Sequence, residues 1–152
     1  MMRIFIFLLL NFVALGLGGL FTSGGVQSEW YQNLNKAPWT PPGWVFGFAW
    51  TSIMICFALY MSQLLKLHPA NSGILLLYAL QWLLNVAWNP LFFRYHATFL
   101  ALLCIVALTL LVAFFAFRYL TFLQWHSLLV APYLVWLCIA VSLNAYICFK
   151  NA

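Results

Sequence analysis

Five long apolar runs constrain the fold of this chain more than any other feature. Short polar breaks separate the runs, which cover residues 4–22, 44–65, 73–93, 97–117 and 123–149. A helix needs about 20 apolar residues to cross a bilayer core of about 30 Å. The runs do not alternate with period two, and backbone groups in lipid must be paired within a helix or a closed barrel. The pattern predicts an all-α integral membrane protein, a five-helix bundle that forms one domain over residues 1–152.

The scarcity of charge supports lipid as the solvent. The 152 residues are 67% hydrophobic and only 5% charged, and Glu29 is the one acidic side chain. A soluble domain uses roughly 25% charged residues to cover its surface. The net charge of +5 does not indicate nucleic acid, because the basic residues stand singly at the edges of apolar runs. We expect the lipid bilayer as a partner and no nucleic acid.

The first apolar run could be mistaken for a signal peptide, because it follows Arg3. It is longer than a typical signal sequence, and no small-residue cleavage site closes it, so we interpret it as a first span. Five spans place the two termini on opposite sides of the membrane. The positive-inside rule does not orient the chain, because three basic residues fall on each side. They are Arg3, Lys66 and Arg118 on one side, and Lys36, Arg94 and Lys150 on the other.

The longest segment outside the runs is residues 23–43, which is too long to be a simple connector. Within it, SEWYQNLNK can form one or two turns of amphipathic helix with Trp30, Tyr31 and Leu34 as its apolar face. Prolines then stiffen the return to the membrane. We expect a structured lid over the helix bundle, with the lid residues Pro38, Pro41, Pro42 and Trp44.

Polar and aromatic side chains recur every three or four residues in two of the apolar runs, which places them on single helix faces. These side chains are Tyr78, Gln81, Asn85 and Trp88 in the third run, and Tyr133, Trp136, Ala140 and Asn144 in the fifth. Each amide, like Asn11 in the first run, could simply hydrogen-bond a neighbouring helix. Taken together, the two stripes and the lid favour a cavity for a flat, mostly apolar ligand.

The tryptophans divide by depth. Trp30 and Trp125 lie near membrane edges and are interpreted as interface anchors. Trp39 and Trp44 fit either an anchor or a cavity wall. Trp50 lies about two turns inside the second run and Trp136 about one turn past Pro132, and these depths favour a cavity.

Conventional catalytic and metal sites find little support. The four cysteines, Cys56, Cys104, Cys138 and Cys148, lie inside apolar runs without C-x-x-C spacing and are interpreted as apolar filler. The three histidines, His68, His96 and His126, lie in or beside expected turns. We therefore expect no metal site, and no haem held by an axial histidine in the bundle core.

Three segments carry a family resemblance. WYQNLNKAPWTPPGWVFGFAW, QWLLNVAWNPLFF and PYLVWLCIAVSLNAYI resemble the TspO/MBR family, the tryptophan-rich sensory proteins of bacteria and the mitochondrial translocator protein, or peripheral benzodiazepine receptor. The resemblance covers nearly the whole chain in the same order. It implies a five-helix bundle, commonly a homodimer, in the cell membrane of a bacterium or the outer mitochondrial membrane of a eukaryote.

The resemblance also implies ligands and site residues. Family ligands are porphyrins and related tetrapyrroles such as haem precursors, sterols in animals, and synthetic aromatic drugs, with no obligatory cofactor. Trp50 and Trp136 match cavity tryptophans associated with porphyrin chemistry. Matching positions also place Asn85 and Trp88 on the ligand face of the third helix, and Ala140 and Asn144 in a region linked to sterol and drug binding. The extra Ala37 before the W-x-P-P-x-W motif departs from the common family pattern.

Three functions remain open on this basis. The ligand-binding residues expected for the first two are Trp39, Trp50, Tyr78, Gln81, Asn85, Trp88, Tyr133, Trp136, Ala140 and Asn144. The first function, which we favour, is a receptor or transporter-like protein for tetrapyrroles and other flat apolar ligands. The second is an enzyme that degrades porphyrin oxidatively in light, with Trp50 and Trp136 as catalytic residues. The third is a stress-linked sensor or scaffold.

Overall fold

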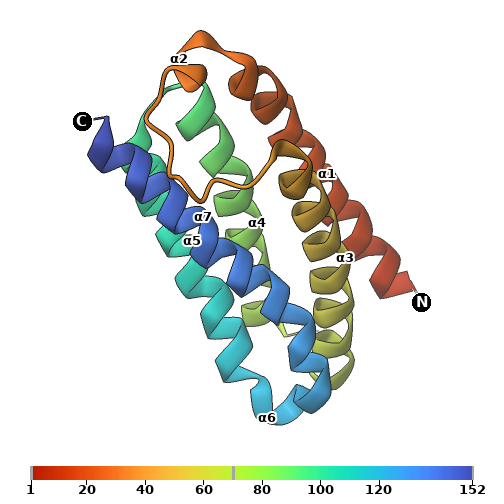
Figure 1. The fold of residues 1–152 in the computed structure, drawn as a ribbon. Coiled ribbons are helices and arrows are strands. Elements are labelled where there is room, and N and C mark those ends of the chain that lie inside the picture. Colours follow the sequence, from red (N-terminus) through yellow and green to blue (C-terminus); the bar gives the residue numbers. More distant parts are fainter. Residues whose placement is uncertain (1, 70, 152) are drawn as a thin grey trace.

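A computed structural model describes residues 2–69 and 71–151, and its described residues form helices and their connections, with no strand. Five helices are long and apolar enough to cross a membrane (Figure 1). They are α1 (Met2–Gln27), α3 (Gly43–Leu67), α4 (Ser72–Phe93), α5 (Thr98–Arg118) and α7 (Ala131–Lys150). The predicted membrane bundle is confirmed.

Two boundaries differ from the sequence-based expectation. The helix α1 continues through Gln27, so the loop between α1 and α3 covers residues 28–42 and not 23–43. It contains one helical turn, α2 (Glu29–Gln32), which begins where the Ser28 hydroxyl accepts a hydrogen bond from the Tyr31 amide at 3.2 Å. A Ser at this position pairs an amide that the helix itself leaves free.

The fifth long helix begins at Ala131 and not at 123. Two short elements precede it, α6 (Leu120–Leu123) and the 3-10 helix η1 (Gln124–Val130). Gln124 has a φ of 47°, in the left-handed region, so a continuous α-helix cannot pass through it. Pro132 then lies in the first turn of α7, where the missing amide hydrogen costs no helical hydrogen bond.

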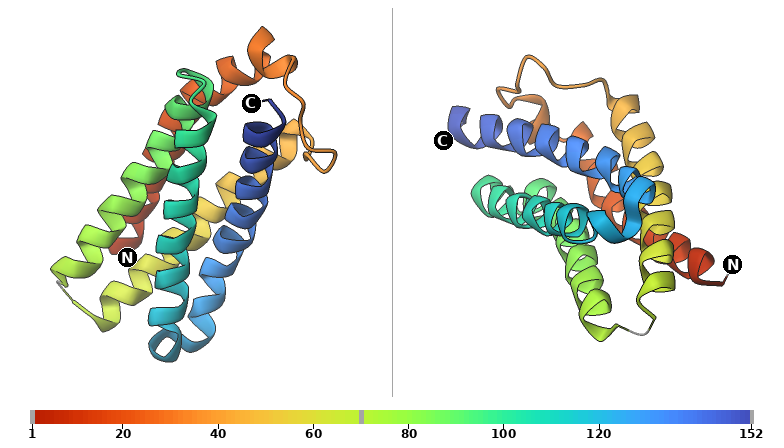
Figure 2. Two further views of the ribbon diagram at one scale, coloured as in Figure 1. Left: turned by 90° about the vertical axis from the view of Figure 1, so that its left-hand side faces the viewer. Right: turned by 90° about the horizontal axis from the view of Figure 1, so that it is seen from below.

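The long helices form a closed ring in which sequence neighbours are not always spatial neighbours. Around the ring the order is α1, α3, α7, α5 and α4, and α4 contacts α1 again. The short element η1 packs against α3 at one end of the bundle. The loop, the α4–α5 turn and the C-terminal end of α7 lie together at the opposite end, which we call the loop end (Figure 2).

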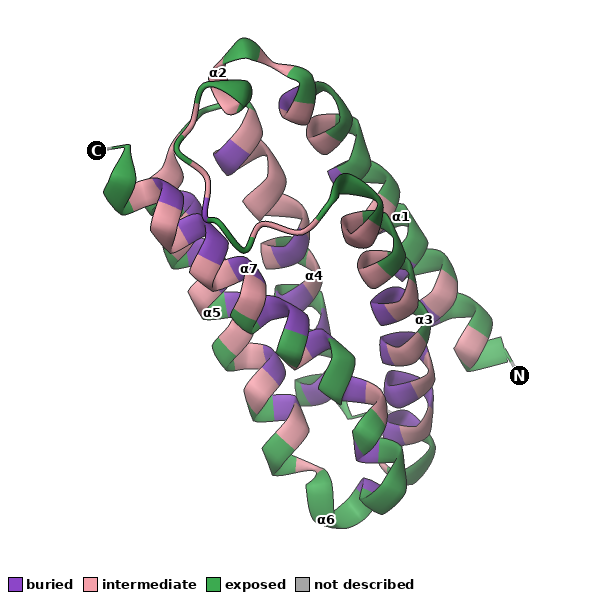
Figure 3. Ribbon diagram, viewed as in Figure 1, coloured by how far each residue is buried: buried purple, intermediate pink, exposed green. Residues whose placement is uncertain are grey.

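The two halves of the bundle are packed differently. On α3, all the buried side chains come from Ile53 onward, and the preceding residues 43–52 contribute none. The core of the other half is built around large buried rings on α3, α5 and α7, namely Phe57, Tyr60, Phe115 and Tyr133. Purple, buried positions accordingly concentrate on the inner faces of the helices, and outward faces are largely green (Figure 3). Those exposed faces carry Phe5, Leu9, Leu76, Leu110 and Phe117, as lipid-facing surfaces do.

Candidate functional site

A cavity of about 570 Å³ lies in the loop-end half of the bundle. Its wall comes from α1, α3, α4, α7 and the loop. The loop crosses from α2 to α3 over this half of the molecule (Figure 1). The volume falls in the range of about 300–1,000 Å³ that is usual for sites of small molecules and cofactors.

Glycines form part of the cavity wall. They are Gly18 and Gly19 of α1, and Gly43 and Gly47 of α3. At Gly18 an added Cβ would lie 2.8 Å from the Asn89 amide nitrogen, so glycine lets α1 approach α4 closely there. At Gly19, Gly43 and Gly47, an added Cβ would meet no other atom within 4 Å. The spacing of four residues between Gly43 and Gly47 puts both glycines on one face of α3.

Aromatic rings supply much of the remaining wall. Trp50, Trp88 and Trp136 line the cavity from three different helices, together with Phe46 and Phe93. The rings support one another edge to face, with centroids 5.3 Å apart for Phe46 and Trp136 and 6.0 Å apart for Trp88 and Phe93. Such pairs hold each ring in a defined orientation. The cavity therefore offers ordered aromatic faces to a ligand.

Few polar groups reach the cavity. Asn85 lines it, and within the described residues its side-chain amide makes no hydrogen bond. The neighbouring Asn89 is engaged, because its amide nitrogen donates to the Asn85 carbonyl at 3.1 Å and its oxygen accepts from the Thr22 hydroxyl at 2.9 Å. The buried indole N–H groups of Trp88 and Trp136 have no protein acceptor in the described part of the chain. Because protein atoms cover both indole nitrogens, the Asn85 amide is the group of this set that could bind a ligand with hydrogen-bond acceptors.

The loop is fastened to the bundle at several points. Trp39 donates its indole N–H to the Ser142 hydroxyl of α7 at 3.1 Å. The Asn35 amide donates to the side-chain oxygen of Asn151 at 2.8 Å. Trp30 stacks on His96 in the α4–α5 turn, with centroids 3.9 Å apart and planes 11° apart. The loop is thus an ordered structure, in which the half-buried Trp30 packs against the α4–α5 turn.

Lys36 is the charged residue among those that line the cavity. Its ammonium donates to the Tyr31 and Gln32 carbonyls at 2.8 and 3.2 Å. It also lies 4.7 Å from the centroid of the Tyr31 ring. Burial raises the pKa of the Tyr31 hydroxyl, so that group stays neutral beside the lysine.

The structure brings half of the expected ligand-binding residues to this cavity. Trp50, Asn85, Trp88, Trp136 and Ala140 line it, as does Pro41 of the expected lid. Asn144 lies in a much smaller adjoining space of about 50 Å³.

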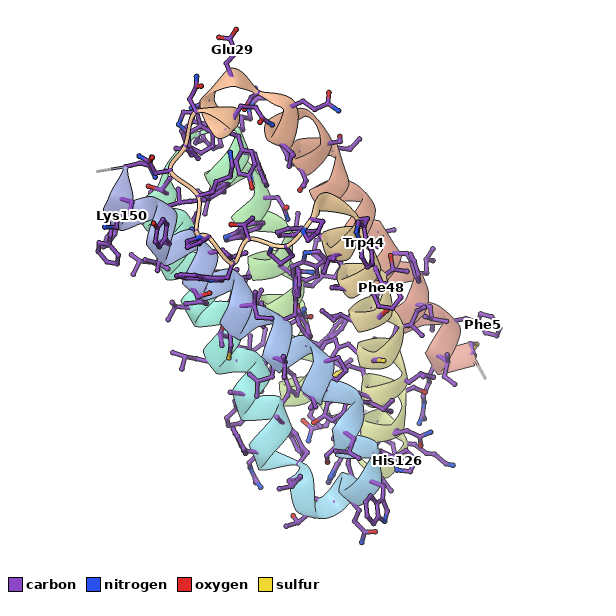
Figure 4. All side chains as sticks on the ribbon, viewed as in Figure 1. Phe5, Glu29, Trp44, Phe48, His126 and Lys150 are labelled. Carbon is purple, nitrogen blue, oxygen red and sulfur yellow. The ribbon has the colours of Figure 1, made fainter. Side chains whose placement is uncertain are left out.

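The other expected residues lie elsewhere. Three belong to the packed core, where the Tyr78 hydroxyl donates to Asn11 at 2.6 Å and the Gln81 amide donates to the Tyr133 hydroxyl at 2.7 Å. Trp39 lies outside the cavity, where it donates a hydrogen bond to Ser142 of α7. Trp44 is 73% exposed on α3 (Figure 4). Pro38 and Pro42 are exposed and do not line the cavity.

The sequence-based analysis missed the contribution of α1 to the wall. Ala14, Gly18, Thr22 and Val26 all line the cavity. Their spacing of four residues was a usable signal, because it places the small side chains on one face of a helix. Phe46 was also missed, although it lies four residues before Trp50 on the same face of α3.

Comparisons with known proteins agree with this architecture. A sequence profile of the TspO/MBR family matches residues 6–150. The chain is 35% identical over 139 residues to the tryptophan-rich sensory protein of Cereibacter sphaeroides, covering 90% of this chain and 87% of that one. It is 33% identical to the protein CrtK of Rhodobacter capsulatus, over 84% of this chain and 79% of that one. It is also 33% identical to the translocator protein of Bos taurus, over 84% and 78% of the two chains.

Proposed function

The chain belongs to the TspO/MBR family of membrane proteins, and on that premise we propose that it binds tetrapyrroles in the aromatic cavity as a receptor or transporter-like protein. Porphyrins and haem precursors are the ligands we favour, and other flat apolar molecules, including sterol-like ones, fit the same description.

One observation carries the proposal, namely three tryptophans from three helices on the wall of one cavity. Trp50, Trp88 and Trp136 present broad apolar faces, and a macrocycle is a large flat π-system that stacks on such faces. A stacked aromatic pair contributes about 0.5–1.5 kcal/mol beyond the area that it buries. The uncharged Asn85 amide supplies orientation, as the few polar groups of apolar sites generally do.

Titration of the purified protein with free-base and metallated porphyrins, followed by tryptophan fluorescence, tests the proposal. Saturable quenching at a stoichiometry of one ligand per chain is the expected result. Since no histidine is among the described residues that line the cavity, free-base and zinc forms should bind similarly. Quenching that rises linearly with porphyrin, as from a probe dissolving in detergent, would contradict the proposal.

A second candidate function rests on the positions of Trp50 and Trp136, which both line the cavity. Indole rings are readily oxidised, so in light they could donate electrons to a bound porphyrin and support its oxidative degradation. Replacement by phenylalanine keeps most of the apolar surface and removes the indole. If the protein is a binder, Trp50→Phe and Trp136→Phe change affinity by at most about tenfold, which is 1.4 kcal/mol.

The degradative function is supported if the same variants abolish product formation while porphyrin still binds. Illuminated samples with and without protein, followed by porphyrin absorbance, give the comparison. We expect equal rates of absorbance loss in the two samples, as for a binding protein.

A further inference from the structure

The cavity combines an apolar aromatic wall with one positive charge at its loop end. Lys36 is the charged residue of the wall, and it comes from the loop, whereas Met54 and Trp136 line the wall from within the bundle. Lys36 is half-buried, so this side chain belongs both to the cavity wall and to the loop surface. A positive charge at the rim of an apolar cavity can contribute to the choice of ligand.

The ammonium of Lys36 is held in position by the loop itself. Two of its three N–H donors meet the Tyr31 and Gln32 carbonyls, and the Tyr31 ring lies 4.7 Å away. The two carbonyls leave one donor free, and neither they nor the ring neutralise the positive charge. Because the loop already fixes the ammonium, a ligand that uses it loses little additional side-chain entropy.

The part of the chain that the structure describes gives Lys36 no counter-ion. Glu29 is the chain's one acidic side chain, and it projects away from the bundle at the loop end (Figure 4). Among the described residues, no carboxylate lies within ion-pair distance of the Lys36 ammonium; its hydrogen-bond acceptors are backbone carbonyls. A negative group on a ligand would thus meet an unpaired cation.

We propose that the cavity selects flat apolar ligands that carry a carboxylate, and that Lys36 binds this carboxylate at the loop end while the macrocycle lies among the tryptophans. The inference rests on the proposed function and adds a ligand class to it. A charge-assisted hydrogen bond of this kind is stronger than a neutral one. Porphyrins with free propionic acid groups should therefore bind more tightly than the same rings with esterified groups.

The test uses protoporphyrin IX and its dimethyl ester, two probes that share one ring and differ in charge. Affinities are measured in nanodiscs of zwitterionic phosphatidylcholine for the wild type, Lys36→Met, Lys36→Arg and the control Lys66→Met. Lys66 is exposed at the opposite end of the bundle and does not line the cavity. Methionine keeps the length of the lysine stem without its charge.

We expect the wild type to bind the diacid at least about tenfold more tightly than the diester, the size expected of a hydrogen bond to a charged group. Lys36→Met should lose that preference and bind the diester as the wild type does. Lys36→Arg and Lys66→Met should keep the preference.

Other outcomes overturn the inference. Equal wild-type affinities for the two probes, or equal losses for both in Lys36→Met, would leave tetrapyrrole binding standing and make Lys36 a structural residue of the loop. A Lys36→Met effect that appears only when anionic phosphatidylglycerol is added would assign the ammonium to a lipid headgroup. Saturable binding of neither probe would overturn the proposed function together with the inference.

Discussion

The side-chain amides of Asn85 and Gln81 lie one turn apart on α4 but have different surroundings. The Gln81 amide donates to the Tyr133 hydroxyl inside the packed core, whereas Asn85 lines the cavity without a hydrogen bond in the described structure. The sequence does not show which of these amides binds a ligand and which binds a neighbouring helix. Substitutions at the two positions can distinguish these roles.

We predict that Asn85→Leu lowers porphyrin affinity by about threefold to tenfold, the size of one neutral hydrogen bond. Thermal stability should be unchanged, because the leucine suits a membrane helix. The matched variant Gln81→Leu should leave affinity nearly intact and lower stability by about 0.6 kcal/mol, and at most about 1.7 kcal/mol. Tryptophan quenching and thermal unfolding measure the two effects. A stability loss in Asn85→Leu that equals the loss in Gln81→Leu would make Asn85 a packing residue.

Sequence reasoning could place both amides on the same helix face but could not separate their roles. Tyr78, Gln81, Asn85 and Trp88 share a stripe, and the periodicity that reveals it is equally consistent with contacts between helices and with contacts to a ligand. The division appears only in three dimensions, where the stripe runs from the core into the cavity. The role of Trp39 could not be read from the sequence either, because its hydrogen bond to Ser142 joins residues 103 positions apart.

At the scale of elements, α1 and α4 approach closely where glycine leaves room. An added Cβ at Gly25 would overlap the Phe93 ring and its Cβ, whereas at the adjacent Gly24 it would meet nothing within 4 Å. The Phe93 Cβ cannot move without moving α4, so the two neighbouring glycines give a matched pair for testing this contact.

We predict that Gly25→Ala destabilises the protein by about 1–3 kcal/mol, as overpacking of a close contact does. Gly24→Ala should leave stability unchanged or raise it by up to about 1 kcal/mol, because alanine is the better helix former. Thermal unfolding in one detergent compares them. Equal stability of the two variants would show that α1 and α4 are not in close contact at Gly25.

The two prolines at the end of the loop should contribute to ligand affinity. Pro41 and Pro42 restrict the chain just before α3 begins, which lowers the entropy lost when the loop is ordered over a ligand. Replacing both with glycine should weaken porphyrin binding by about fourfold to thirtyfold, since each such change alters the chain entropy by about 0.4–1 kcal/mol. The helical signal should persist. Pro69→Gly, at the opposite end of the bundle, serves as the control and should leave affinity unchanged.

The sequence predicted the existence of the elements better than their ends. The apolar runs located all five long helices, because length and composition decide whether a segment can cross a bilayer. The run 123–149 did not reveal the break before Ala131, because the apolar end of η1, Leu128–Val130, continues directly into α7. The left-handed backbone of Gln124 carries no mark in the sequence such as a glycine.

At the scale of the whole molecule, the ring order was beyond the sequence. Consecutive helices α3 and α4 are not ring neighbours, since α1 lies between them and closes the ring. This arrangement carries α1 into the cavity wall and makes α3 and α7 neighbours, which bring Phe46 and Trp136 together in that wall. The number of crossings, in contrast, follows directly from the apolar runs and fixes which connections share a side.

Five crossings predict that the two ends of the chain lie on opposite sides of the membrane. The first residue of α1 and the last turn of α3 lie toward one end of the bundle, and the α4–α5 turn and the last turn of α7 lie at the loop end (Figure 2). Met2, Lys66, Arg94 and Lys150 belong to these four segments in that order. In a background with the four native cysteines replaced by alanine, single cysteines at these positions are treated with a charged, membrane-impermeant maleimide. We expect Met2→Cys and Lys66→Cys to react from one side, and Arg94→Cys and Lys150→Cys only from the other. Labelling after solubilisation controls for intrinsic reactivity. Reaction of Met2→Cys and Lys150→Cys from the same side would require an even number of crossings. Because three basic residues lie at each end, labelling is also what decides which end faces the cytoplasm.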